Sequence, residues 1–189
     1  MTLISDHYKS QLNQLHTREV MWGASALRWE PDLLDLASRL RAKTVLDYGC
    51  GKGALKDSID KRHKLRKLEV REYDPGIVGK DKMPEPADLV ACLDVIEHLE
   101  PECLLDVLKH LESLARTGLL LVIALYPSNT LLPDGRDSHL ILESPEWWAG
   151  KLAEVFDDLK WEMKFEHRPR PCRNTNRPKD VLMVEITRS

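Results

Sequence analysis

Residues 44–55 decide how this chain folds, and they read Thr44-Val45-Leu46-Asp47-Tyr48-Gly49-Cys50-Gly51-Lys52-Gly53-Ala54-Leu55. An apolar run ends in an aspartate, and three glycines follow at alternate positions before a helix-forming segment. This order is typical of a strand that stops, turns tightly and enters a helix. Glycines let the backbone approach a bound molecule closely, and the start of the following helix offers free N–H groups. The stretch therefore predicts a binding site for a nucleotide-like cofactor.

The composition indicates one globular domain. The chain has 189 residues, of which 42% are apolar and 31% charged, and a formal net charge of −3 that argues against a generally basic nucleic-acid binder. No apolar run reaches the ~18 residues of a membrane span, and the N-terminus lacks the features of a signal peptide. We therefore expect a cytoplasmic protein without membrane contact. Its four cysteines form no CxxC pair and suggest neither a zinc site nor a disulfide framework: Cys50, Cys92, Cys103 and Cys172.

Strand-like and helix-like segments alternate along the chain, which predicts an α/β fold. We expect a doubly wound, mostly parallel sheet with helices on both faces, and a single domain over residues 1–189 in which residues 1–30 form an N-terminal helix and a cofactor-capping loop. The last two strand-like runs, 159–166 and 181–187, have no helix between them and predict an antiparallel hairpin. Ligands of such sheets bind beyond the carboxyl ends of the strands, where Asp47, Asp74 and Asp94 are expected.

Two other nucleotide sites compete with this interpretation. Residues 49–54 also fit the G-x-G-x-x-A dinucleotide fingerprint, with Asp74 about 20 positions further on. However, the Asp47 carboxylate would repel a pyrophosphate, whereas it would attract a cofactor that carries an ammonium group. A Walker-type phosphate loop is excluded because Lys52-Gly53 is not followed by Ser or Thr at the required spacing.

These residues resemble the class I S-adenosylmethionine-dependent methyltransferases. The first motif of that superfamily, D-x-G-x-G-x-G, is met by Asp47 and the three glycines, and Asp74 matches the acidic residue that holds the ribose. The run Cys92-Leu93-Asp94-Val95-Ile96-Glu97-His98-Leu99 is similar to the superfamily's fourth-strand signature. The likeness is clear over residues 40–125, and the compact form looks like small bacterial or phage members. It implies a Rossmann-like fold. This sequence departs from the family at residues 76–86, which read as a loop, so we expect the third strand to be abbreviated.

The resemblance implies S-adenosylmethionine as the cofactor and a set of contacts for it. Asp47 would attract the ammonium group, and Trp22-Gly23 would close over the methionine end; Asp81 is a further candidate for the adenine. Simpler alternatives stay open for three of these contacts: Asp74 also fits an ordinary turn before proline, Asp94 a helix cap, and Trp22 a loop aromatic that fills the core. The expected cofactor-binding residues are Trp22, Gly23, Asp47, Tyr48, Gly49, Cys50, Gly51, Gly53, Asp74, Pro75, Asp94 and Val95.

Glu97, His98 and His139 are the candidate catalytic residues. They are expected near the rim of the sheet, where a histidine would take a proton from an oxygen or nitrogen nucleophile. The small-RNA 3′-end 2′-O-methyltransferases hold a divalent metal with a similar Glu-x-x-Glu-His motif and a later His, but here Asp94 stands at the first position. Glu97-His98 would alternatively brace the sheet. We expect no resident metal ion.

The sequence says least about the acceptor. Four arginines in the loop of residues 167–179 favour an anionic small molecule, a nucleotide or a saccharide precursor: Arg168, Arg170, Arg173 and Arg177. We therefore expect methyl transfer to an oxygen or nitrogen atom of such an acceptor. The alternatives are a metal-assisted RNA ribose 2′-O-methyltransferase and a non-catalytic scaffold that binds the cofactor.

Overall fold

The computed structural model describes five stretches of the chain: residues 2–18, 25–62, 68–156, 160–168 and 180–188. Their strands form one sheet of six, in the order β2-β1-β3-β4-β6-β5. The strands are β1 (Thr44–Tyr48), β2 (Glu69–Tyr73), β3 (Ala87–Leu93), β4 (Ala115–Ala124), β5 (Trp161–Arg168) and β6 (Val181–Arg188). The first four run parallel, while β6 is antiparallel to both β4 and β5. The predicted parallel sheet with a C-terminal antiparallel hairpin is therefore confirmed.

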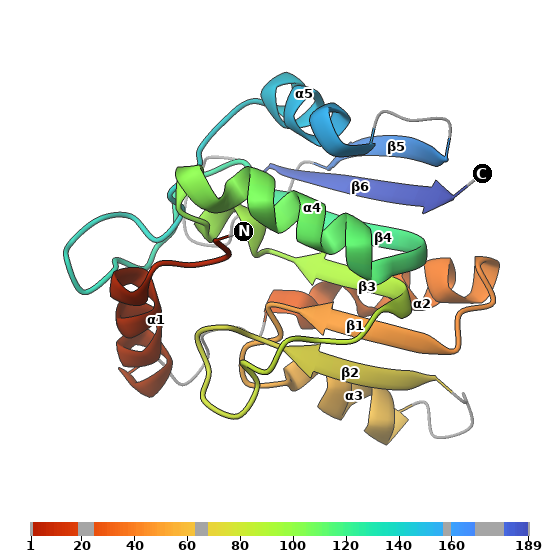
Figure 1. Cartoon of the computed structure of the whole chain (residues 1–189), viewed down its shortest axis with the longest axis horizontal. Helices are drawn as coiled ribbons and strands as arrows, with labels where there is room; N and C mark the ends of the chain where they lie inside the picture. Colours follow the sequence, from red (N-terminus) through yellow and green to blue (C-terminus); the bar gives the residue numbers. More distant parts are fainter. Residues whose placement is uncertain (1, 19–24, 63–67, 157–159, 169–179, 189) are drawn as a thin grey trace.

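Helices cover both faces of this sheet, as predicted (Figure 1). The core on one face includes buried residues of α4 (Leu104–Leu114) and α5 (Pro145–Phe156). The core on the other face includes residues of the 3₁₀ turn η1 (Ser25–Trp29), α2 (Glu30–Arg39) and α3 (Ala54–Arg62). Strand β3 is buried between them, and its residues alternate: Val90 and Cys92 join the first core, Leu89 and Ala91 the second. This period of two is the geometry of a central strand.

The connection from β2 to β3 contains no strand. Residues 74–86 are turns and irregular backbone, and Asp74 N–H bonds to the carbonyl of Lys80 at 3.0 Å. Strand β2 consequently lies at the edge of the sheet. The abbreviated third strand predicted from residues 76–86 is confirmed.

Helix α1 (Asp6–Arg18) belongs to neither layer. It lies beyond the carboxyl ends of the parallel strands (Figure 1). There Tyr8 and Leu15 form a small separate core with Leu132. No helix in the described part of the chain is long and apolar enough to cross a membrane.

Candidate functional site

The glycine turn after β1 needs glycine for two physical reasons. Gly49, Gly51 and Gly53 have φ angles of +78°, +53° and +87°, a region that side chains disfavour. At Gly49 there is also no room, because a Cβ atom there would lie 2.6 Å from both methyl carbons of Val95. Gly49 N–H bonds to the carbonyl of Tyr73 at 2.7 Å. The turn is thereby fixed against the ends of both β2 and β3.

Asp74 joins the ends of β1 and β2. One carboxylate oxygen accepts the N–H of Gly51 at 2.9 Å, and the other accepts the N–H of Gly76 at 2.8 Å. The side chain is buried, yet it lines a cavity of about 250 Å³ at this edge of the sheet. Each carboxylate oxygen has further lone pairs, so the group can still accept hydrogen bonds from two ligand hydroxyls. The bond to Gly76 fits the turn role that the sequence allowed, and the role of Asp74 in holding the ribose stays a prediction.

The cavity contains most of the predicted cofactor-binding residues. Seven of them line it: Tyr48, Gly49, Gly51, Asp74, Pro75, Asp94 and Val95. Trp22 and Gly23 lie outside the described residues. The catalytic candidates Glu97, His98 and His139 line the same cavity. The structure thus brings the two predicted halves of the site into one space.

Three predicted cofactor-binding residues do not line the cavity: Asp47, Cys50 and Gly53. Asp47 is fully buried, and burial together with the negative charge of Glu72 raises its pKa to about 7. Gly53 packs against the Glu72 carboxylate, which pairs with the ammonium of Lys80 at 2.9 Å. Successive side chains of a strand point to opposite faces, so Tyr48 reaches the cavity and Asp47 does not. The contact of Asp47 with an ammonium group stays a prediction.

Asp94 holds a strained backbone conformation at the end of β3. Its φ is +56°, and its N–H bonds to the carbonyl of Val122 at 2.9 Å. One carboxylate oxygen accepts a 3.3 Å hydrogen bond from the indole of Trp29, while the other is buried with no hydrogen-bond partner among the described residues. The next element is the 3₁₀ turn η2 (Ile96–His98), and its N-cap is Val95. Asp94 therefore does not cap this turn. The carboxylate is instead available to the cavity.

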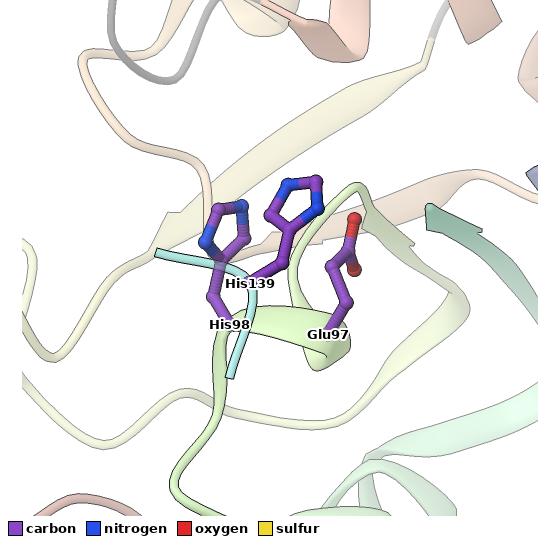
Figure 2. Close-up of side chains that lie close together, drawn as sticks. All are labelled: Glu97, His98 and His139. Atoms are coloured by element: carbon purple, nitrogen blue, oxygen red, sulfur yellow. The ribbon is translucent and has the colours of Figure 1, made fainter. Parts of the chain in front are cut away.

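Glu97 is buried at the junction between η2 and β4. One carboxylate oxygen accepts the N–H of Ala124 at 3.0 Å, and the other has no hydrogen-bond partner in the described part of the chain. Burial and the nearby carboxylate of Asp94 raise the pKa of Glu97 well above its usual range. Glu97 therefore braces the sheet, as one alternative expected, and presents its second oxygen next to the two histidines (Figure 2).

The backbone fixes the tautomer of both histidines. Nδ1 of His98 lies 2.7 Å from the carbonyl of Ser138, and Nδ1 of His139 lies 2.6 Å from the carbonyl of Tyr126. A carbonyl oxygen only accepts, so Nδ1 donates in each ring and Nε2 is the basic nitrogen. Burial and the neighbouring His139 lower the pKa of His98 to about 3. His98 is therefore neutral at physiological pH. An imidazole with so low a pKa is a weak base, which argues against His98 as the group that accepts a proton during the reaction.

Glu97, His98 and His139 have the geometry of a cation site. Each offers a ligand atom, and these atoms all lie within 4.8 Å of one another (Figure 2). Two imidazole nitrogens and one carboxyl oxygen suit a divalent transition metal, and histidine ligands commonly donate their other ring nitrogen to a carbonyl. The residues present therefore fit such an ion, although the sequence favours a site without one.

Sequence reasoning missed the contribution of α1. Tyr8, Leu12 and His16 of this helix line the cavity together with Ile4 just before it, and their spacing of four is the signal that could have revealed it. Reasoning from charge also misjudged Arg168, which pairs with Asp32 at 3.0 Å and Glu166 at 2.7 Å. The other three arginines of that loop lie outside the described residues.

Comparison with known proteins shows a match to one protein family. Residues 21–172 match the model of a family described as a methyltransferase domain. No curated protein matched the sequence. Among solved structures, 1,6-didemethyltoxoflavin-N1-methyltransferase from Burkholderia thailandensis, with bound S-adenosylhomocysteine, is 16% identical with a TM-score of 0.65, over 100% of this chain and 92% of that one.

Two further structures share the fold. Magnesium protoporphyrin IX methyltransferase from Synechocystis PCC 6803, with bound S-adenosylmethionine, is 17% identical with a TM-score of 0.58, over 100% of both chains. The methyltransferase domain of bacterial CtHen1 is 18% identical with a TM-score of 0.54, over 84% of this chain and 96% of that one. These identities establish likeness of fold, and the first two proteins are named for different acceptors.

Proposed function

We propose, because this chain belongs to the methyltransferase domain family, that it transfers the methyl group of S-adenosylmethionine to an oxygen or nitrogen atom of a small acceptor. The observation that carries this proposal is the shared cavity, which joins Gly51 and Asp74 at one end to His98 and His139 at the other. When bound, the cofactor supplies a methyl carbon that the acceptor's lone pair attacks while the carbon–sulfur bond breaks toward sulfur. The protein must chiefly align the two partners.

The residues around the glycine turn would hold the cofactor. The positive φ angles of Gly49 and Gly51 expose backbone at the cavity surface, so a ligand can approach closely there. Asp74 would accept hydrogen bonds from the two ribose hydroxyls with the lone pairs that Gly51 and Gly76 leave. Asp47, in its ionised form, would contribute negative charge beneath the turn, toward the ammonium group.

The other end of the cavity would handle the acceptor. Because the pKa of His98 is lowered to about 3, His139 is the better candidate to accept a proton at Nε2 as the new bond forms. Arg28 also lines the cavity and supports an anionic acceptor. The carboxylate of Asp94 lines the same cavity and accepts a hydrogen bond from the indole of Trp29.

Two measurements test the proposed function. Calorimetry should show that the protein binds S-adenosylhomocysteine, and methyl-labelled cofactor should transfer label to low-mass acceptors. His139→Ala should abolish the transfer and leave the cofactor affinity within twofold, whereas Asp74→Ala should weaken the affinity itself. A protein that binds no cofactor contradicts the proposal, and one that binds it but transfers label to no class of acceptor supports the scaffold alternative.

A metal-assisted RNA ribose 2′-O-methyltransferase is the second candidate, and the cluster of Glu97, His98 and His139 favours it. A divalent ion held there would draw a ribose hydroxyl to the cavity and lower its pKa. This candidate predicts that Mn²⁺ or Mg²⁺ restores activity lost in chelator, and that Mn²⁺ raises the thermal midpoint of the wild type but not of His98→Ala. Full activity in chelator would exclude it.

A further inference from the structure

The adenosine side of the cavity lacks an element that a longer sheet would supply. Strand β2 is the edge strand, and residues 74–86 contain no strand that would extend the sheet past Asp74. Asp81, the residue that the sequence offered for the adenine, pairs instead with Lys9 of α1 at 3.0 Å. Some other part of the chain must therefore cover a nucleoside bound at Asp74.

One stripe of α1 faces this gap. Tyr8, Leu12 and His16 recur every four residues and all line the cavity, as does Ile4 just before the helix, whereas the opposite face of the helix, including Ser10 and Gln14, does not. From Tyr8 to His16 the helix advances about 12 Å at 1.5 Å per residue. The stripe therefore extends from the histidine end of the cavity to the Asp74 end.

The last two members of the stripe lie at the Asp74 end. The Leu12 side chain is so close to Gly76 that a Cβ atom on that glycine would be 3.1 Å away from it. Nδ1 of His16 is buried with no hydrogen-bond partner in the described ranges, although the imidazole lies within the electrostatic influence of Asp74. A buried polar atom without a partner is costly unless a ligand satisfies it.

Hydrogen bonds hold α1 in this position. The hydroxyl of Tyr8 donates to the carbonyl of His98 at 2.6 Å, and Ser5 donates its backbone N–H and its hydroxyl to the carboxylate of Glu100 at 2.8 and 2.6 Å. Gln11 donates to Asp134 at 2.8 Å. Because these partners lie outside α1 in sequence, the stripe is a fixed wall of the cavity.

We propose that α1 forms the adenosine wall of the cofactor site, with Leu12 against the nucleoside and Nδ1 of His16 hydrogen-bonded to it. This inference rests on the proposed function. In it, the N-terminal helix covers the nucleoside on the side where the abbreviated sheet has no further strand. Leu12 contributes an apolar surface, which suits the face of a purine. His16 supplies one directional contact beside the ribose that Asp74 holds.

Calorimetry with two ligands tests the proposal. S-adenosylhomocysteine carries both the nucleoside and the amino-acid part, whereas 5′-methylthioadenosine carries the nucleoside alone. His16→Ala and Leu12→Ala should each weaken both ligands about 5- to 10-fold, because a contact to the shared nucleoside is lost. Asp47→Asn should weaken only S-adenosylhomocysteine, because its predicted partner is the ammonium group.

Matched variants separate binding from folding. Thr17→Ala should leave both affinities within twofold, because among the described residues the Thr17 hydroxyl bonds only to the carbonyl of Asn13 within α1. His16→Asn keeps a polar side chain of smaller size, and circular dichroism of each variant verifies that the helices are retained.

Two results would overturn the inference. One is an unchanged affinity for both ligands in His16→Ala and Leu12→Ala. The other is a loss confined to S-adenosylhomocysteine, which would place the stripe at the amino-acid end. A wild type that binds neither ligand would contradict the proposed function itself, so the two failures are distinguishable.

Discussion

Gly49→Ala should lower the free energy of unfolding more than an alanine placed at another glycine with a left-handed backbone. Position 49 has a φ of +78°, which costs an alanine about 1–2 kcal/mol. The new Cβ would also lie 2.6 Å from both methyl carbons of Val95, and overpacking of this kind costs about 1–3 kcal/mol. The expected loss is therefore about 2–5 kcal/mol, a large part of the ~5–15 kcal/mol that stabilises a typical domain.

Gly135→Ala is the matched control for this prediction. Gly135 has a φ of +89°, and a Cβ atom at this position would meet nothing within 4 Å, so the variant reports the conformational cost alone. Urea unfolding of the two variants should therefore differ by about 1–3 kcal/mol, the part due to Val95. Adding Val95→Ala should recover most of this difference in a double-mutant cycle.

Equal losses at Gly49 and Gly135 would refute the reasoning, because they would mean that Val95 moves aside without cost. The same variants also test the site. Gly49→Ala should weaken S-adenosylhomocysteine in calorimetry, since the turn that it displaces lines the cavity, and Gly135→Ala should not.

Three other predictions concern charge and anchoring. Asp74→Asn should weaken S-adenosylhomocysteine about 10- to 100-fold in calorimetry, because hydrogen bonds to a charged group are worth about 1.5–3 kcal/mol; an unchanged affinity would remove Asp74 from the ribose site. The pKa of Asp47 is raised to about 7, so between the ordinary carboxyl pKa and 7 the native state binds more protons than the unfolded state, and this group lowers stability as pH rises. Asp47→Asn should therefore flatten the fall in unfolding free energy between pH 4 and pH 7 relative to wild type, and a parallel profile would contradict the assigned cause. Tyr8→Phe should cost about 1 kcal/mol in urea unfolding through its lost bond to the His98 carbonyl, and no loss at all would mean that α1 is not anchored there.

Local patterns made the sheet and the glycine turn predictable. Strand β1 and its turn follow from an apolar run that ends in spaced glycines, and the hairpin of β5 and β6 follows from the absence of a helical pattern between them. Asp74 was predictable because parallel strands end at the same edge of a sheet. In each case the determining signal lies within a few neighbouring residues.

Contacts between distant residues could not be predicted in this way. Nothing near Asp47 in sequence shows that its carboxyl lies beneath the turn with Glu72 and away from the cavity. Arg168 looks like a free cation until Asp32, 136 positions away in sequence, is seen to pair with it. The role of α1 likewise depends on how the helix docks, because its residues bond to partners such as His98 and Asp134.

The left-handed backbone of Asp94 limits how stable this protein can become. A glycine at that position would relieve about 1 kcal/mol or more of strain, but it would remove the carboxylate that lines the cavity and receives the Trp29 indole. Selection for thermal stability and selection for a working site therefore favour different residues at position 94. A screen for heat-resistant variants that ignores activity is expected to return Asp94→Gly. A loss of activity in such variants would identify Asp94 as part of the site.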